Sequence, residues 1–260
     1  MNNDELILIT NDDGYKARGL KVLNYVARKL SNNIWSFAPS LNNSGKSHSI
    51  TINKKTKVKY IGSQKFHVDG TPVDCVIVAK KYLSLKNLKP NLILSGINYG
   101  QNLGFDILYS GTFAAAREAS IQGIKAFSIS LEKNQKSSNW QTVKYLLPKI
   151  LNNIKKLNIK PSICFNINFP NVKINSIKGC KVVKLGKRKP GEHLEIINTN
   201  KNSFFFKIPS ERKIHSSASI NEDEYEMKKN FITITYHCNL DFNERLLSKK
   251  ITESIGKIIE

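Results

Sequence analysis

Short apolar segments that alternate with amphipathic segments constrain the fold of this chain most strongly. Residues 5–10 read ELILIT, and residues 17–30 then place their apolar side chains at helical spacing. Strands that are apolar throughout are typical of parallel sheets covered by helices. The sequence therefore predicts an α/β fold whose mostly parallel sheet carries helices on both faces. Further strands are expected at residues 34–38, 91–95, 126–130 and 163–169, and further helices at residues 73–85, 113–122 and 140–157.

The pattern changes after Gly186. Residues 187–220 are basic and rich in turn formers, and they contain the aromatic run Phe204-Phe205-Phe206. This composition indicates a β-hairpin arm, a kind of element that often serves oligomerisation. We interpret the chain as a catalytic α/β core (residues 1–186), an excursion or oligomerisation arm (187–230), and a return to the core (231–260) with a last strand (231–236, FITITY) and a C-terminal helix (246–259).

The net charge of +21 is the most unusual property of the composition. A strongly basic chain can bind nucleic acid or attract phosphorylated substrates. Lysine is spread along the whole chain, however, and Asn and Ile are abundant too, a composition that also arises in AT-rich genomes. A solvated basic surface is therefore favoured over a polyanion site, and nucleic acid is not expected as a partner.

The N-terminal residues show no targeting signal. Met1 is followed by Asp4, Glu5 and a short apolar run, and no later apolar run approaches the ~20 residues that a membrane span needs. The four cysteines are scattered without a CxxC pair, which favours reduced structural thiols over zinc ligation. These features predict a cytoplasmic protein.

Two adjacent carboxylates, Asp12 and Asp13, directly follow the first predicted strand, in the sequence TNDDG. They repel each other at the end of an apolar strand, and burial of either one without a cation is costly. A divalent metal ion resolves both problems, because hard cations prefer oxygen ligands in close array. The alternative is an N-terminal helix cap, which Asp also favours. A cap needs only one Asp, so the pair favours a metal.

A polar loop follows the second predicted strand, at residues 38–49. Its segment Ser44-Gly45-Lys46-Ser47 is similar to the end of a P-loop, but Ser40 stands where that motif requires glycine. Residues 49–52 also look like a strand, whereas a P-loop continues into a helix. The P-loop is therefore rejected, and the loop remains a cluster of hydroxyls, amides and one imidazole, His48, suited to metal and phosphate oxygens.

A glycine-rich segment follows the strand predicted at residues 91–95. Its glycines let the backbone approach a ligand closely, and Asn98 and Asn102 offer carbonyl oxygens or amide donors. Ser110-Gly111-Thr112 then precedes a predicted helix, so hydroxyls and free N–H groups form a ready anion site. A turn with an N-cap would explain Thr112 alone. Because these polar segments all follow the carboxyl ends of strands, we expect them on one rim of the sheet.

The segments, in this order, resemble the SurE family of 5′/3′-nucleotidases and acid phosphatases. The resemblance covers about the first 130 residues strongly. The later half matches weakly, since Lys228-Lys229-Asn230 precedes the FITITY strand where the family usually has a glycine. The motifs that carry the resemblance are TNDDG, the loop NNSGKSHSIT after Ala38-Pro39, VDGTPVDCV at residues 68–76, and SGINYGQNLGFDILYSGTFAAAREA at residues 95–119.

The resemblance implies a Rossmann-like core and a metal-dependent phosphomonoesterase acting on nucleoside 5′- or 3′-monophosphates. It also implies one divalent ion per subunit, Mg²⁺ or Mn²⁺, and homodimers or homotetramers joined by exchanged C-terminal elements. An all-oxygen site tolerates Ca²⁺ as well. Matched by motif, the family's metal ligands fall on Asp12, Asp13, Ser44 and Asn98.

The expected catalytic residues are Asp12 and Asp13, acting through a metal ion that lowers the pKa of a bound water. The haloacid-dehalogenase pattern separates two aspartates by one residue, so metal-activated water is favoured here over covalent catalysis. His48 either orients water or the leaving group, or is a structural loop residue. The competing function is a basic nucleic-acid-binding module that keeps the fold. Substrate contacts are expected from Asn11, Gly45, Asn102, Ser110, Gly111 and Thr112.

Overall fold

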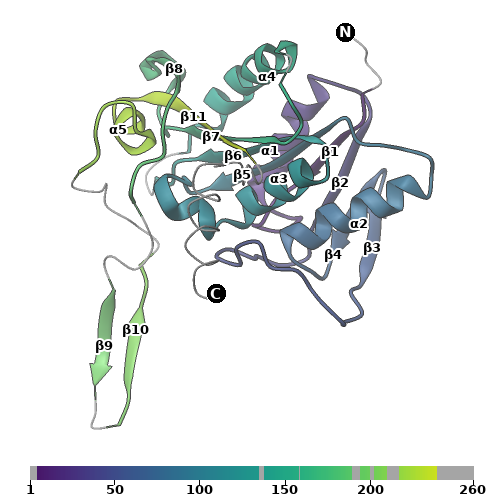
Figure 1. Cartoon of the computed structure of the whole chain (residues 1–260), viewed down its shortest axis with the longest axis horizontal. Coiled ribbons are helices and arrows are strands. Elements are labelled where there is room, and N and C mark those ends of the chain that lie inside the picture. The colour runs from purple at the N-terminus through teal and green to yellow at the C-terminus, as the bar shows by residue number, and fades with distance from the viewer. Residues whose placement is uncertain are drawn as a thin grey trace, which may run out of the picture.

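A nine-stranded sheet forms the centre of the molecule (Figure 1). The computed structural model describes residues 5–134, 138–157, 159–188, 194–199, 202–209 and 217–238. Among the described strands of this sheet, neighbours pair in parallel except at β3–β4 and β7–β11. The order is β3-β4-β2-β1-β5-β6-β7-β11-β8, with β1 (Ile7–Thr10), β2 (Ile34–Pro39), β3 (Val58–Gly62), β4 (Lys65–Val68), β5 (Leu92–Tyr99), β6 (Lys125–Leu131), β7 (Ile163–Phe169), β8 (Gly179–Val182) and β11 (Phe231–Cys238).

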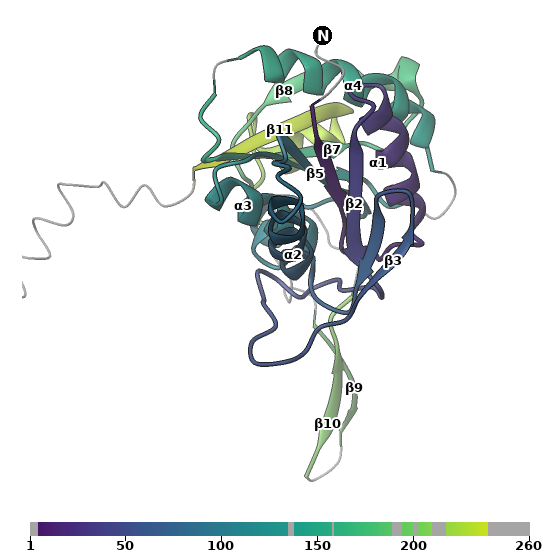
Figure 2. The same ribbon diagram turned by 90° about the vertical axis from the view of Figure 1, so that its right-hand side faces the viewer.

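Helices cover both faces of the sheet (Figure 2). Helices α1 (Arg18–Arg28) and α4 (Trp140–Lys156) pack on one face, where they contact each other. Helices α2 (Pro72–Ser84) and α3 (Gly111–Ile121) pack on the other face. Each pair of helices closes its own hydrophobic cluster against the sheet, and the mostly parallel α/β fold expected from the sequence is confirmed.

Strand β1 explains why the strands of this chain are apolar throughout. Ile7 and Ile9 belong to the cluster under α1 and α4, whereas Leu8 belongs to the cluster under α2 and α3. Successive side chains of a strand point to opposite faces, so a strand covered by helices on both faces favours apolar side chains at successive positions. The first polar residues after β1 therefore appear where the strand leaves the core.

The strand expected at residues 49–52 is wrong. The Thr71 hydroxyl donates a hydrogen bond to the carbonyl of Ser49 (2.7 Å), and the Asp74 carboxylate accepts from the backbone N–H (3.0 Å) and hydroxyl (2.6 Å) of Thr51. Thr71 and Asp74 also form the capping box that begins α2. Residues 49–52 are thus tied to a helix terminus rather than to a strand ladder.

The edge strands β3 and β8, and β4 next to β3, were not expected from the sequence. All four of the first residues of β3 are exposed, and lysines interrupt the apolar positions of β3 and β4. Lysine on an edge strand discourages pairing with another chain, but it also removes the apolar signal by which a strand is recognised. A strand at the border of a sheet is therefore harder to predict than a central one.

A hairpin in the segment that follows Gly186 projects from the rest of the molecule (Figure 1). It consists of β9 (Glu195–Thr199) and β10 (Phe204–Lys207), which pair in an antiparallel two-stranded sheet. The chain then returns through α5 (Asp223–Lys228) to β11. The helix expected at residues 246–259 lies outside the described residues. None of the described helices combines the length and the apolar composition that crossing a bilayer would require.

Candidate active site

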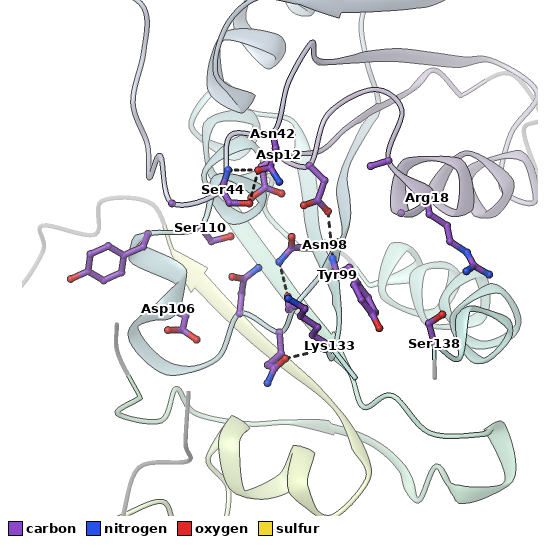
Figure 3. Close-up of a pocket in the computed structure, with 18 of the residues that line it drawn as sticks. Asp12, Arg18, Asn42, Ser44, Asn98, Tyr99, Asp106, Ser110, Lys133 and Ser138 are labelled. Atoms are coloured by element: carbon purple, nitrogen blue, oxygen red, sulfur yellow. Dashed lines mark hydrogen bonds between the residues drawn. The ribbon is translucent and has the colours of Figure 1, made fainter. Parts of the chain in front are cut away.

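A cavity of about 820 Å³ opens at the carboxyl ends of β1 and β5 (Figure 3). Ligands of open parallel sheets bind at this edge. The walls come from segments far apart in the sequence, namely the ends of these two strands, the loop after β2, and the start of α3. Of the residues predicted for the site, those that line the cavity are Asp12, Asp13, Ser44, Gly45, Asn98, Asn102 and Ser110.

Asp12 is buried at the inner end of the cavity, and α3 holds it there. The Thr112 hydroxyl donates a short hydrogen bond to Asp12 Oδ1. A Cβ atom on Gly111 would lie 2.9 Å from Asp12 Cβ and 3.0 Å from Pro72 Cγ, so only glycine fits at this position. Gly111 and Thr112 do not line the cavity. The structure places them behind Asp12, where they fix its position.

The two aspartates are electrostatically unfavourable as a pair of anions. Burial, followed by the charge of Asp13, raises the pKa of Asp12 to about 6. Burial also raises the pKa of Asp13, whose Oδ2 accepts a long hydrogen bond from the Tyr99 N–H (3.5 Å). A cation between the two carboxylates would reverse both effects.

The helix-cap alternative for the aspartates is wrong. Helix α1 begins at Arg18, its N-cap residue is Ala17, and no side chain caps it. The first turn of α1 instead borders the cavity through Arg18 and Gly19, with uncapped N–H groups that favour an anion.

Ser44 and Asn98 line the same cavity as the two aspartates (Figure 3). The loop that carries Ser44 is joined to the first motif by a hydrogen bond from the Asn43 N–H to the Asp12 carbonyl (2.7 Å). The Ser44 hydroxyl donates to Asn42 Oδ1 (2.7 Å), and its lone pairs remain for a ligand. Asn98 Nδ2 donates to the Gly100 carbonyl (2.6 Å), which fixes the amide and leaves Oδ1 as its free acceptor.

These residues fit a hard divalent cation by the chemistry of their donors. Among the described residues, no group of three or more His, Cys, Asp or Glu side chains could hold a metal ion. An ion at Asp12 and Asp13 would therefore complete its shell with the Ser44 hydroxyl, the Asn98 amide oxygen and water. Mg²⁺, Mn²⁺ and Ca²⁺ accept such all-oxygen shells, and the desolvated carboxylate pair favours their charge.

Besides Gly111 and Thr112, two more residues predicted for the site, Asn11 and His48, lie outside the cavity lining. Asn11 is buried and donates through Nδ2 to the Gly14 carbonyl (2.9 Å), which shapes the turn after β1. His48 Nε2 lies 3.0 Å from Glu118 Oε2 on α3. The position of His48 favours the structural alternative, a contact that anchors the loop of Ser44 to α3.

Asparagines that the sequence analysis did not single out form the floor beneath Asn102. The Asn102 carbonyl accepts hydrogen bonds from Asn166 Nδ2 (2.9 Å) and Asn168 Nδ2 (3.0 Å), and its N–H donates to Asn168 Oδ1 (2.8 Å). Both partners lie on β7, fully buried. The signal was present in the sequence, since amides at alternate positions of an apolar strand need buried partners.

The second feature that sequence reasoning missed is a group of buried charges next to the cavity. Arg188 lines the cavity and is almost fully buried, and its Nε donates to Asp106 Oδ2 (2.8 Å). The Arg188 N–H donates to Glu224 Oε1 (2.8 Å). Asp223 accepts from the N–H groups of Gly104 (2.9 Å) and Gly186 (2.8 Å). Residues at both ends of the predicted arm thus hold the loop that carries Asn102.

Asp223 makes the stability of this arrangement depend on pH. Burial raises its pKa to about 6, from 3.8 for an ordinary aspartate. Its contribution is therefore fully present below about pH 3.8 and is lost as the pH rises through about 6. We expect the unfolding free energy of the wild type, measured by urea relative to Asp223→Asn, to fall by about 2–3 kcal/mol between about pH 4 and about pH 7. A difference that does not change with pH would contradict this assignment.

The outer wall of the cavity is aromatic and cationic. The ring centroids of Tyr99 and Trp140 lie 5.7 Å apart, and the Arg18 guanidinium lies 5.7 Å from the Trp140 ring centroid. The Tyr99 hydroxyl donates to the Asn134 carbonyl (2.6 Å), which fixes the ring. Lys133 lines the same wall. The cavity therefore combines an oxygen-rich inner end with a wall that suits a flat, anionic ligand.

Comparisons with known proteins agree with this geometry. The family model described as Survival protein SurE matches residues 7–192. The 5′-nucleotidase SurE of Rhodopseudomonas palustris (strain TIE-1) is 36% identical over 255 residues, which cover 96% of this chain and 99% of that relative. The 5′-nucleotidase SurE of Paramagnetospirillum magneticum is 40% identical over 189 residues, covering 72% of each chain.

A solved structure has the same fold over nearly the whole chain. The crystal structure of the SurE protein from Aquifex aeolicus matches with a TM-score of 0.83 at 30% sequence identity, and it covers 95% of this chain and 98% of that one. The family model, the relatives and the fold agree with the motifs that surround the cavity. This chain belongs to the SurE family.

Proposed function

We propose that this protein is a nucleotidase that hydrolyses nucleoside 5′- or 3′-monophosphates to nucleoside and phosphate with the help of a divalent metal ion. Relatives that match most of this chain are named 5′-nucleotidases. The observation that carries the proposal is the convergence of Asp12, Asp13, Ser44 and Asn98 on one cavity. Their oxygens suit Mg²⁺ or Mn²⁺, the ions most often paired with phosphate chemistry.

The ion would supply charge neutralisation at the phosphoryl oxygens and activation of a water as the nucleophile. Asp12 and Asp13 would hold it, with Thr112 keeping the Asp12 carboxylate in one orientation through its hydroxyl. Because α3 fixes Asp12 from behind, this side chain has no need to reorganise when charge develops during the reaction.

The phosphate would lie between the aspartates and the start of α3. Ser110 Oγ accepts from the Phe113 N–H (3.1 Å), so the Ser110 hydroxyl proton remains available for a phosphoryl oxygen. Gly45 lies at the opposite side, where its φ of +75° and the open space around it let the backbone approach a ligand. The nucleoside would then extend toward Tyr99 and Trp140 on the outer wall.

A phosphate-release assay tests the proposed function. The protein should hydrolyse AMP and p-nitrophenyl phosphate in the presence of Mn²⁺ or Mg²⁺. This activity should disappear in excess chelator and return when the metal is restored. The removal and return of the metal also distinguish a nucleotidase from the competing function. A nucleic-acid-binding module needs no divalent ion, and its affinity for nucleic acid falls steeply as the salt concentration rises. Hydrolysis that persists undiminished in chelator after dialysis would rule out the metal-dependent mechanism.

We also propose that the β9–β10 hairpin is covered by a second copy of the chain. An isolated two-stranded hairpin is marginally stable in water. Ile196, Phe204 and Phe205 are each at least 59% exposed, so this hairpin presents apolar side chains that nothing in the described part of the chain covers. A homodimer or homotetramer would bury them.

A further inference from the structure

Acidic residues are excluded from two long stretches of the sequence, and these stretches supply two neighbouring helices. Residues 14–68 and residues 133–191 contain no Asp or Glu. Helix α1 comes from the first stretch and α4 from the second, and the two helices contact each other on one face of the sheet (Figure 2). An AT-rich genome explains abundant lysine, but it does not explain why neither of these two helices carries an acidic residue.

Two exposed tyrosines lie among the lysines of this face. Tyr25 on α1 is 44% exposed, and its ring centroid lies 5.4 Å from Lys29 Nζ and 5.1 Å from Lys144 Nζ, so it receives a cation from each helix. Tyr145 on α4 is 55% exposed and lies 3.7 Å from Lys149 Nζ. We define the α1–α4 face by the residues Lys21, Tyr25, Arg28, Lys29, Lys144, Tyr145 and Lys149.

The α1–α4 face leads directly to the cavity. Both helices run from the carboxyl edge of the parallel strands, so both of their N-termini border the cavity, with Arg18 at the first turn of α1 and Trp140 at the first turn of α4. The Arg18 guanidinium lies over the Trp140 ring. A cation and an aromatic ring thus continue the pattern of the face up to the candidate active site.

We propose that the α1–α4 face binds single-stranded nucleic acid and directs its phosphorylated end into the cavity. Grooves that bind single strands combine cations for the phosphates with aromatic rings for the bases, and this face has both. The exposed tyrosines favour nucleic acid over inorganic polyphosphate, which has no base to stack. The delivery of the phosphorylated end rests on the proposed phosphatase function, whereas binding to the face does not.

Binding is tested separately from hydrolysis. The probe is a single strand of about 12 nucleotides, phosphorylated at its 5′ end and carrying a fluorescent label at its 3′ end. The full chain is added to this probe in the presence of chelator, and binding is followed by fluorescence anisotropy at about 50 and about 200 mM KCl. The triple variant Lys21→Gln, Lys29→Gln, Lys149→Gln should bind at least about tenfold more weakly. The slope of the logarithm of its binding constant against the logarithm of the salt concentration should become less steep by up to about 2. Each lost phosphate contact removes about 0.7 from the steepness of this slope. Tyr25→Leu should weaken binding at least about fivefold at both salt concentrations.

A matched control sits on the opposite face of the sheet. Lys81, Lys86 and Lys89 are exposed on and after α2, and changing all three to Gln removes the same charge. This control should bind the probe within about twofold of the wild type. Equal losses in the two triple variants would overturn the proposal, because they would indicate attraction to net charge alone. The proposal would also be overturned if Tyr25→Leu binds the probe as tightly as the wild type and polyphosphate displaces the probe as well as unlabelled oligonucleotide does.

Hydrolysis supplies the second readout. In the α1–α4 triple variant, kcat/KM for AMP should stay within about twofold of the wild type, because none of the three lysines lines the cavity. For a 5′-phosphorylated oligonucleotide it should fall at least about tenfold. If the wild type hydrolyses neither AMP nor the oligonucleotide, the proposed function is refuted, and the binding result still stands. If the triple variant lowers kcat/KM by the same factor for AMP and for the oligonucleotide, relative to the wild type, delivery of the phosphorylated end to the cavity is refuted.

Discussion

Replacing Asp13 with asparagine is expected to lower kcat/KM for AMP by on the order of 1,000-fold or more, while the protein keeps its fold. Asparagine preserves the shape and one acceptor oxygen, but it removes one of the two charges proposed to hold the cation. Asp13 is partly exposed, and within the described residues its carboxylate accepts only the long hydrogen bond from the Tyr99 N–H (3.5 Å), so the fold does not depend on it. Metal-dependent phosphate release and thermal unfolding measure the two effects.

The control for this variant is Asp69→Asn. Asp69 is exposed, lies outside the cavity and carries the same charge, so its removal should leave kcat/KM unchanged. Metal titration followed by the melting temperature gives a third readout, in which Asp13→Asn should lose most of the stabilisation that Mn²⁺ gives the wild type. A fully active Asp13→Asn protein would refute the assignment of the metal site.

Replacing Arg188 with methionine is expected to destabilise the protein by about 3–5 kcal/mol, because the buried Asp106 carboxylate loses its cation. For a chain of this size, a loss of that magnitude lowers the melting temperature by roughly 6–20 °C. Activity should fall as well, since Arg188 also donates to the Gln101 carbonyl (3.3 Å) beside Asn102. Urea unfolding measures the free energy, and AMP hydrolysis measures the effect on the site.

A double variant separates the charge from the packing. Arg188→Met combined with Asp106→Asn should recover at least half of the lost stability, because no carboxylate is then buried without its cation. Lys155→Met provides the matched control, since the Lys155–Glu5 pair is more exposed and its loss should cost no more than about 1 kcal/mol. Equal losses in Arg188→Met and Lys155→Met would contradict the role given to the buried pair.

The central part of the fold was predictable because its physical cause is local. Residues 7–9 of β1 and residues 92–94 of β5 are buried on both faces of the sheet, so each forms an apolar run in the sequence. Edge strand β3 is exposed and carries no such run. Residues 49–52 look like a strand for the same local reason, yet the side chains of Thr71 and Asp74 decide their conformation.

The candidate site likewise contains residues that the sequence predicts and contacts that it does not. Asp12, Asp13, Ser44 and Asn98 could be named in advance because each lies in a recognisable motif, either among the last residues of a strand, as Asn98 does in β5, or in the loop that follows one. The contact between Arg188 and Asp106 could not, because 82 positions separate the two residues and only the folded chain brings them together. Gly104 and Asp223 are separated by 119 positions. Partners at such distances leave no pattern in one sequence.

The close contact between Gly111 and Asp12 sets a condition for moving this site to another protein. A designer who copies Asp12, Asp13, Ser44 and Asn98 onto a new scaffold reproduces the donors but not their support. The residue behind Asp12 must also lack a Cβ, since that atom would lie 2.9 Å from Asp12 Cβ. The smallest portable unit is therefore the strand end together with the first turn of the helix behind it.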